Sequence, residues 1–508
     1  MRNILKSFFS IIEYKIYLLL LLYSVLILFI VSPDSYTHDL YSRCDSAWFF
    51  MCGKAWMNGL VPYVDFADSK GPLLWLIYGI GYLISPYDYI GVFWLSCLCY
   101  SITFFFCYKI GSLLLLSRRK GFIVAIFMAI PYLWHYFHYE TRAEDWCHPF
   151  VVISFYMLLK MILQFHQCIG KECGFAIGIS VMATLLIKWS IAVMLLCVAG
   201  SVFLILIYRK QKVAGYLLSF FISALLFASP FVLYLISKDC FKNFIAEYFV
   251  NTAKTVSSGG FADVISLYID EIKQFASVRF LFIIYLLAGL FFYWKHKKLT
   301  IFPWLCSLAF VAISIHHDNF GFYITISATF ALWFVALVVN YLDFRWTNSQ
   351  IFIAMLIPLF AGIWNLRHHD NLYFQESETR DSFYKVNYLM SQVENPKIIN
   401  SGSEYGLGIS CNALPGSRYW ALQLGATDEM CEERAVSVSK GIPDFLIIST
   451  YGQKFEGLRE SNYCYYMSCR GETGVKVDIW GRPNLKLPPE KFKVLTKDIL
   501  FKNRIVFE

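Results

Sequence analysis

The sequence predicts a polytopic α-helical membrane protein of about eleven spans, with interfacial helices in its first external loop and a small α/β domain near its C-terminus. Two observations predict this fold class. The 508 residues are 58% hydrophobic and 19% aromatic, which is more apolar than a soluble domain of this size. Uncharged runs such as 16–32 and 121–137 are long enough, or nearly so, to cross roughly 30 Å of hydrocarbon as helices.

The position of the basic residues predicts the orientation of the chain. Clusters of Lys and Arg precede the first span and recur at alternate turns, within residues 2–15, 118–120, 171, 209–212 and 295–298. Placing all of them in the cytoplasm satisfies the positive-inside rule, so we expect a cytoplasmic N-terminus. The net charge of +8 is spread over separate turns, which argues against a nucleic-acid partner. No cleavage pattern follows the first apolar segment, which is therefore predicted to be an uncleaved span.

With these anchors the chain divides into a membrane domain, residues 1–366, and an extracytoplasmic α/β domain, residues 367–508. The spans are predicted at 16–33, 90–116, 121–138, 148–165, 174–188, 190–208, 214–236, 280–294, 300–315, 321–342 and 350–366. The run Leu73–Ser85 is too short to cross comfortably, so we place it as a helix at the outer interface. Residues 237–279 form a second external loop. Short apolar runs at 397–399, 445–448 and 475–479 predict strands in the C-terminal domain.

Four cysteines fall in the C-terminal domain: Cys411, Cys431, Cys464 and Cys469. An oxidising compartment permits disulfides there, but the spacing fixes no pairing, and free thiols are an equal alternative. The spacing of Cys464 and Cys469 is not that of a standard zinc site.

The first external loop gathers Asp45, Asp65, Asp68 and Lys70. Charges at a membrane boundary are costly unless they are solvated, paired or functional. Later loops add charged or polar residues on the same side, namely Arg142, Glu144, Asp145, Lys188 and His317. We expect these groups to converge on one face, where a carboxylate can take the proton of a hydroxyl and cations can offset charge on a phosphate.

Each of these residues also has a structural explanation. Asp45 could cap a helix, Lys70 could be a lysine at the membrane interface, and Arg142 with Glu144 could form an ordinary ion pair. Lys188 lies near a turn, where lysines are common, and the histidines at 316–317 could be interfacial. The joint placement of the charges favours a functional site, because the structural explanations do not require it.

The first-loop pattern Asp45-x3-Phe49…Gly53…Gly59-Leu-Val-Pro-Tyr63-x-Asp65-x2-Asp68-x-Lys70-Gly-Pro-Leu-Leu74 resembles that of the GT-C membrane glycosyltransferases. The branch it resembles is shared by protein O-mannosyltransferases (glycosyltransferase family 39), aminoarabinose transferases and Rgt-type lipopolysaccharide transferases. The resemblance covers residues 10–366. It implies a polyprenyl-phosphate sugar donor and a glycan, lipopolysaccharide or protein acceptor.

Carried over by this resemblance, Asp45 is the expected base and Lys70 the contact to the lipid phosphate. Arg142, Glu144 and Asp145 would shape the second half of the site, and which of the two acids is the working catalytic residue stays open. Asp65 and Asp68 are expected to shape the loop or to pair with Lys70. This chain has Ser46 after Asp45, where many relatives carry Glu. Some branches use a divalent metal and others do not, so no metal is assigned.

Two other functions fit a polytopic protein of this kind. A transporter or flippase of lipid-linked glycans would carry charges at the midplane of several spans and inverted repeats, whereas the predicted spans hold few charges. A non-catalytic subunit of a glycan-assembly complex would not depend on the carboxylate of Asp45.

Overall fold

The structure is a computed structural model, which describes residues 11–35, 45–133, 141–163, 170–252, 283–285, 287–288, 290–291, 294, 328–342, 347–368, 377–402, 405–421, 427–449, 455, 463–470, 476–483 and 485. The chain divides into two compact units. Unit 1 consists of Met1–Val31, Ser96–Tyr234 and Ala253–His368, and unit 2 of Ser32–Leu95, Leu235–Thr252 and His369–Glu508. Each unit is described by itself.

Unit 1 is built of apolar helices. They are α2 (Ile11–Val31), α5 (Ile90–Leu115), α6 (Arg118–Phe127), α7 (Ala129–Leu133), α8 (Ala143–Leu163), α9 (Gly170–Leu185), α10 (Trp189–Tyr208), α11 (Ala214–Ser237), α18 (Ala331–Tyr341) and α19 (Asn348–His368), of which α5 begins and α11 ends in unit 2. Five described helices are long and apolar enough to cross a membrane: Glu13–Val31, Ile90–Leu115, Ala143–Leu163, Trp189–Tyr208 and Ala214–Ser237. The chain is therefore a multi-pass membrane protein.

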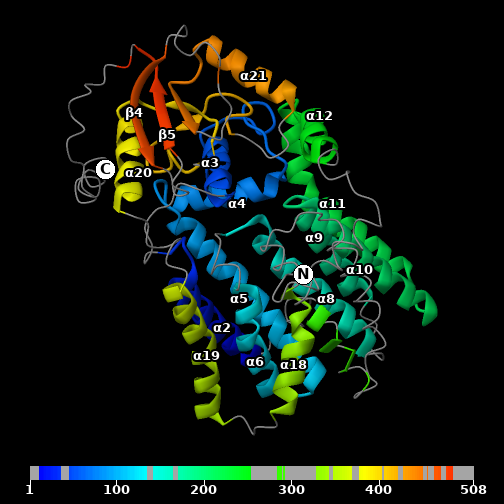
Figure 1. Cartoon of the computed structure of the whole chain (residues 1–508). Helices are drawn as coiled ribbons and strands as arrows, with labels where there is room; N and C mark the ends of the chain where they lie inside the picture. Colours follow the sequence, from blue (N-terminus) through cyan, green and yellow to red (C-terminus); the bar gives the residue numbers. More distant parts are fainter. Residues whose placement is uncertain are drawn as a thin grey trace. The chain divides into compact units, whose positions relative to one another are not determined.

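Small residues let the helices of unit 1 approach closely. In Figure 1, α8, α9 and α10 lie side by side, while α6 packs against α18 and α19. A Cβ added at Gly174 of α9 would lie 2.3 Å from the carbonyl oxygen of Tyr216, and one added at Gly178 would lie 2.4 Å from that of Phe220. Such contacts are typical of membrane helices, which associate by close packing rather than by the hydrophobic effect.

The five long helices coincide with five of the predicted spans, but the count of eleven stays a prediction. The predicted span 121–138 is divided at Met128 into α6 and α7, and α9 is only 16 residues long. The predicted span 300–315 lies outside the described residues, and those at 280–294 and 321–342 are described only in part.

Unit 2 contains the two helices of the first external loop, α3 (Asp45–Met57) and α4 (Pro72–Ile84). Pro72 opens α4 at a position where its missing N–H is not needed, directly after the extended Gly71. The helices cross closely, since a Cβ added at Gly53 of α3 would lie 2.4 Å from the amide nitrogen of Gly79. The helix predicted at Leu73–Ser85 is thus confirmed as a helix, and its place at the interface stays a prediction.

The rest of unit 2 comes from the second external loop and the C-terminal region, residues 369–508. Its helices are α12 (Phe241–Phe244), the π-helix η2 (Ile245–Asn251), α20 (Ser377–Ser391) and α21 (Asp428–Ser439). The strands are β1 (Lys397–Asn400), β2 (Leu414–Pro415), β3 (Phe445–Ser449), β4 (Cys464–Arg470) and β5 (Lys476–Gly481). They form one sheet of order β2-β1-β3-β5-β4, in which β1 pairs in parallel with β2 and β3, and β5 pairs antiparallel with β3 and β4.

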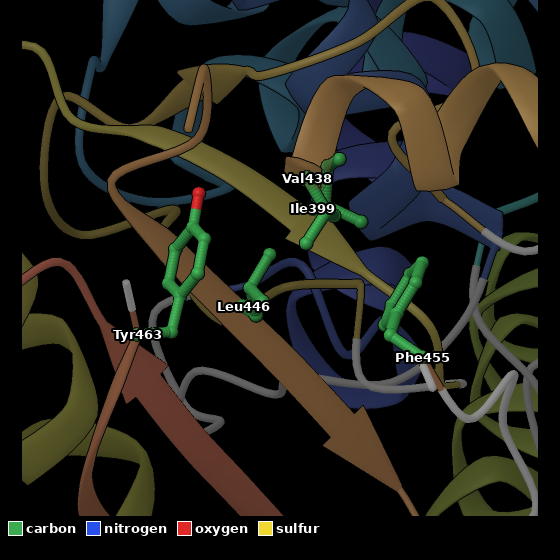
Figure 2. Close-up of a cluster of buried hydrophobic side chains, with 5 residues drawn as sticks. All are labelled: Ile399, Val438, Leu446, Phe455 and Tyr463. Carbon is green, nitrogen blue, oxygen red and sulfur yellow. The ribbon is translucent and has the colours of Figure 1, made fainter. Parts of the chain in front are cut away.

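A cluster of buried apolar side chains holds α21 on this sheet (Figure 2). Ile399 of β1 and Leu446 of β3 meet Val438 of α21, while Phe455 and Tyr463 complete the cluster. Three of the strands coincide with the apolar runs from which strands were predicted. Unit 2 joins them to the first external loop, however, so an independent C-terminal domain at 367–508 stays a prediction.

The four cysteines of the C-terminal region differ in exposure. Cys411 and Cys469 are buried, Cys431 is half-buried and Cys464 is exposed. In the part of the chain that the structure describes, no disulfide joins any two of these four cysteines.

Candidate functional site

Three charged residues of the first external loop form what we call the loop cluster: Asp45, Asp68 and Lys70. Asp45 is the first residue of α3, where a negative charge also stabilises the helix N-terminus. Lys70 directly precedes Gly71 and α4. Its Nζ lies 3.2 Å from Ser69 Oγ and 5.7 Å from the centroid of the Phe49 ring.

Asp68 is buried, with a relative exposure of 4%. Its Oδ1 accepts a hydrogen bond from the Ser69 hydroxyl at 3.2 Å, whereas its Oδ2 has no hydrogen-bond partner among the described residues. Burial raises the pKa of Asp68, and the Asp45 carboxylate raises it further, while the Lys70 ammonium lowers it. Asp45 and Lys70 therefore both lie within electrostatic reach of Asp68.

The ionised form of Asp68 is expected to cost stability at neutral pH. Its pKa in the folded state lies above the unfolded value of 3.8, so the folded state binds more protons and stability falls as pH rises through that window. Asp68→Asn is therefore expected to raise the unfolding midpoint at pH 7 and to lose this advantage below pH 3.8. Thermal unfolding in detergent at both pH values checks this. The exposed Asp65→Asn is the matched control, and an Asp68→Asn midpoint below the wild-type value at pH 7 would contradict the account.

The conformation of the loop is fixed by Tyr63. This residue is fully buried and has a φ of 65°, a region that bulky residues rarely adopt. Its hydroxyl donates to the Lys70 carbonyl oxygen at 2.9 Å, and its ring lies 4.7 Å from that of Trp75. Asp65 is exposed, and its Oδ2 accepts from the Val61 amide at 2.7 Å. Asp65 thus makes a hydrogen bond within the loop, and its role in the site stays a prediction.

A second group, the helix cluster, lies in unit 1 and consists of Arg142, Glu144 and Lys188. Glu144 is 4% exposed and accepts a hydrogen bond from Lys188 Nζ, which forms an ion pair with it. Lys188 is the N-cap residue of α10, in the turn after α9. The structure therefore brings together two residues that are far apart in the sequence, and Glu144 pairs with Lys188 rather than with Arg142 alone.

The prediction that Glu144 and Asp145 lie in a loop before a span at 148 is wrong, because α8 begins at Ala143 and both acids lie in its first turn. The reason is local capping. Asp145 Oδ2 accepts from the Arg142 amide at 2.7 Å, which satisfies a backbone N–H at the start of the helix.

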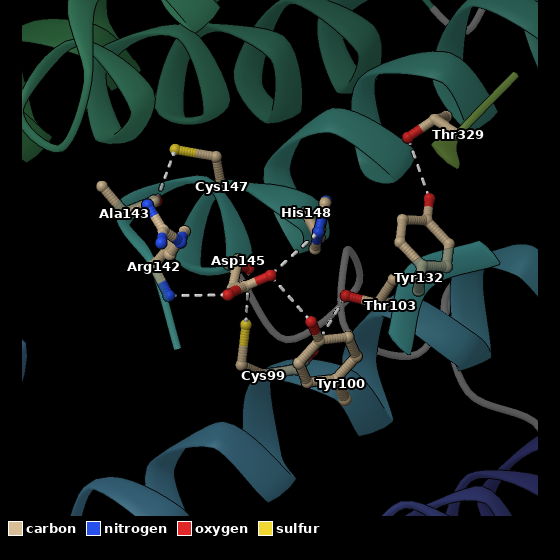
Figure 3. Close-up of polar contacts among 10 residues, drawn as sticks. All are labelled: Cys99, Tyr100, Thr103, Tyr132, Arg142, Ala143, Asp145, Cys147, His148 and Thr329. Atoms are coloured by element: carbon tan, nitrogen blue, oxygen red, sulfur yellow. Dashed lines mark hydrogen bonds and ion pairs between the residues drawn. The ribbon is translucent and has the colours of Figure 1, made fainter. Parts of the chain in front are cut away.

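Asp145 is also held on its other side, as Figure 3 shows. Its Oδ1 accepts from the Tyr100 hydroxyl at 2.9 Å and lies 3.4 Å from His148 Nε2. The ring of His148 packs edge-on to Tyr132, whose hydroxyl lies 2.9 Å from Thr329 Oγ1. Asp145 is 1% exposed, and this network joins α5, α7 and α8 and holds its carboxylate in place.

Other charged residues were not singled out from the sequence. Lys54 is fully buried in α3, and Glu247 of η2 forms an ion pair with Arg418 and accepts from the Tyr419 hydroxyl at 2.6 Å. The only signal for Lys54 was a single charge inside an otherwise apolar helix. His317 lies outside the described residues. In the part of the chain that the structure describes, no three His, Cys, Asp or Glu side chains gather in a way that could hold a metal ion.

Comparison with known proteins identifies the fold. No protein-family profile matches the chain, and no curated protein sequence matches it. Among solved structures, ArnT from Cupriavidus metallidurans bound to undecaprenyl phosphate matches with a TM-score of 0.54 and 15% identity, over 93% of this chain and 99% of ArnT. The apo state of the same ArnT matches with a TM-score of 0.54 and 13% identity over the same shares. The fold of this chain is therefore similar to that of ArnT, and the predicted resemblance to the GT-C transferases is confirmed at the level of the fold.

Proposed function

We propose that this protein is a membrane glycosyltransferase that moves a sugar from a polyprenyl-phosphate donor to a cell-envelope acceptor, on the outer face of the bacterial inner membrane. The observation that carries the proposal is the loop cluster, which holds two carboxylates and one ammonium together in a chain whose fold resembles ArnT. The ArnT structure contains undecaprenyl phosphate, and we infer that this chain binds a lipid of the same class.

The proposed reaction is a single displacement with inversion at the anomeric carbon. Asp45 takes the proton of the acceptor hydroxyl as its oxygen attacks the anomeric carbon. The bond from that carbon to the phosphate oxygen breaks at the same time, and the polyprenyl phosphate departs with the electron pair. Lys70 offsets the negative charge that develops on the phosphate. Asp45 is suited to the role of base because it is less buried than Asp68, whose pKa is raised.

In the helix cluster we propose Glu144 rather than Asp145 as the acid that takes part in substrate binding. Both oxygens of Asp145 are engaged by neighbouring groups, whereas Glu144 forms its ion pair with Lys188. Lys188 and Arg142 would contact the anionic part of a substrate. The acceptor in this proposal is a lipopolysaccharide, another glycan or a protein. The proposal extends to any sugar that the polyprenyl phosphate carries.

A transporter of lipid-linked glycans is the main alternative. Two lysines of the helices near their predicted cytoplasmic ends form ion pairs, Lys109 with Glu13 and Lys160 with Glu172. These pairs tie neighbouring helices together, so they give no support to a line of charges along a transport path.

Lys70→Met tests the donor site. We expect undecaprenyl phosphate to bind about 10- to 100-fold more weakly, since a hydrogen bond to a charged group contributes about 1.5–3 kcal/mol. Binding is measured by the thermal shift of the purified protein over a titration with undecaprenyl phosphate. The exposed Lys242→Met in the same unit is the matched control and is expected to bind as the wild type does. Equal affinity of Lys70→Met and wild type would remove Lys70 from the donor site.

A further inference from the structure

The side chain of Lys54 is fully buried, although it carries an ammonium group. Its Nζ donates to the carbonyl oxygens of Gly408 at 3.1 Å and of Ile409 at 3.4 Å, and also to that of Cys411. All three belong to one turn of the C-terminal region, residues 405–411, which we call the docking turn. An ammonium has three donors and no acceptor, so three converging carbonyls match it.

The docking turn is built to present these carbonyls. Asn387 of α20, which is 1% exposed, accepts with its Oδ1 from the amides of Gly408 at 3.0 Å and Ser410 at 3.1 Å. The amides therefore face α20 and the carbonyls face α3. Gly408 has a φ of +115°, and a Cβ there would lie 2.9 Å from the Cβ of Ala413, so glycine is required.

As a source of stability alone, Lys54 is a poor choice. Its described partners are neutral carbonyls rather than carboxylates, and burial lowers its pKa to about 8. An apolar side chain of similar volume often stabilises a buried position more than an ion does, whereas a buried charge can define one unique arrangement. The contact between the Lys54 ammonium and the three carbonyls therefore specifies the register between α3 and the docking turn.

Asp45 lies at the other end of the same helix. α3 has 13 residues, and Asp45 lies about 14 Å from Lys54 along the helix axis. In the first turn of α3, Trp48 makes a second contact with the C-terminal region, since its ring lies 4.8 Å from that of Tyr405 and 6.3 Å from that of Trp420. On its other face, α3 is pressed against α4 at Gly53 and Gly79. Because α3 is a rigid helix held at these points, its orientation also determines the position of its first residue, Asp45.

We propose that Lys54 is a positioning residue, through which the C-terminal region holds α3 in the orientation that directs Asp45 at the acceptor hydroxyl. This rests on the proposed function, in which Asp45 is the base. Through Lys54 the C-terminal region would affect the rate of sugar transfer, although none of its own residues takes part in the chemistry. The effect can be large, because a misplacement of about 1 Å at a reacting group can cost about a hundredfold in rate.

The test uses Lys54→Met in the full-length protein, with a deletion strain for activity and undecaprenyl phosphate as the binding probe. We expect glycan product to fall about tenfold or more, undecaprenyl phosphate affinity to stay within about twofold and the unfolding midpoint not to fall. A purely structural role would lower the midpoint, and binding would fall with it. The control is Asn58→Ala, just after α3, which removes side-chain hydrogen bonds to Tyr82 of α4 and to the Lys54 carbonyl oxygen but leaves the Lys54 ammonium and its three partners in place. It is expected to give normal product.

Asn387→Ala repeats the test from the other side of the docking turn, and it carries the test if Lys54→Met does not accumulate. It leaves Lys54 intact and releases the amides of Gly408 and Ser410. We expect the same loss of product with undecaprenyl phosphate affinity unchanged. Wild-type product from folded Lys54→Met or from Asn387→Ala would overturn the inference. The proposed function fails separately, if Asp45→Asn also gives wild-type product.

Discussion

Asp45→Asn is expected to lower sugar transfer by about 10²–10⁴-fold, the range that a positioned general base contributes. The amide has almost the same shape as the carboxylate but cannot take the proton of an attacking hydroxyl. The side chain is only partly buried and opens α3, so the variant is expected to fold and to bind undecaprenyl phosphate as the wild type does. The measurement is the initial rate of product formation at equal amounts of folded protein.

The matched control is Asp65→Asn, which removes a carboxylate of the same loop that is exposed and bonded to the Val61 amide. It is expected to keep most of the transfer activity. If Asp45→Asn and Asp65→Asn lose activity to the same degree, loop conformation rather than the carboxylate of Asp45 controls the rate.

The second large effect concerns stability. Lys188→Met would leave Glu144, which is 4% exposed, as a buried charge without its ion-pair partner. Removing one member of a buried pair costs about 3–5 kcal/mol, because the remaining charge stays out of water. We therefore expect a clearly lower unfolding midpoint in detergent for Lys188→Met, and a partial recovery in the double variant Glu144→Gln with Lys188→Met, in which neither charge of the ion pair remains without the other.

Lys171→Met is the control, because this lysine is exposed and lies in the same unit. It is expected to unfold as the wild type does. Additive losses in Glu144→Gln, Lys188→Met and the double variant would mean that the two side chains do not stabilise each other, and the ion pair would then have no part in the stability of unit 1.

Elements with a strong local signal could be predicted from the sequence. Gly71 and Pro72 indicate the start of α4, and the apolar runs of β1, β3 and β5 indicate buried strands. The strand β4 was not predicted, because it lies at the sheet edge and carries alternating polar residues such as Ser468. The long helices were identified from length and apolar composition, which is what a bilayer selects.

Contacts between distant residues could not be predicted in the same way. The choice between Glu144 and Asp145 depends on Tyr100 and Lys188, neither of which has a sequence spacing that points to this site. Lys54 looked like any lysine on a helix until its three carbonyl partners in the docking turn were located. The loop motif around Asp45 and Lys70 could be identified early because a short segment contains all of it.

The most direct test of the central claim, that sugar passes from a polyprenyl phosphate to an envelope acceptor, is mass-spectrometric glycan profiling of a deletion strain. The strain is complemented with wild type, Asp45→Asn or Lys70→Met at matched protein levels. The account predicts that a sugar residue is missing from the glycan of the deletion strain, returns with wild type and stays missing with both variants, while the sugar-charged lipid accumulates. Full restoration of the glycan by both variants would contradict it.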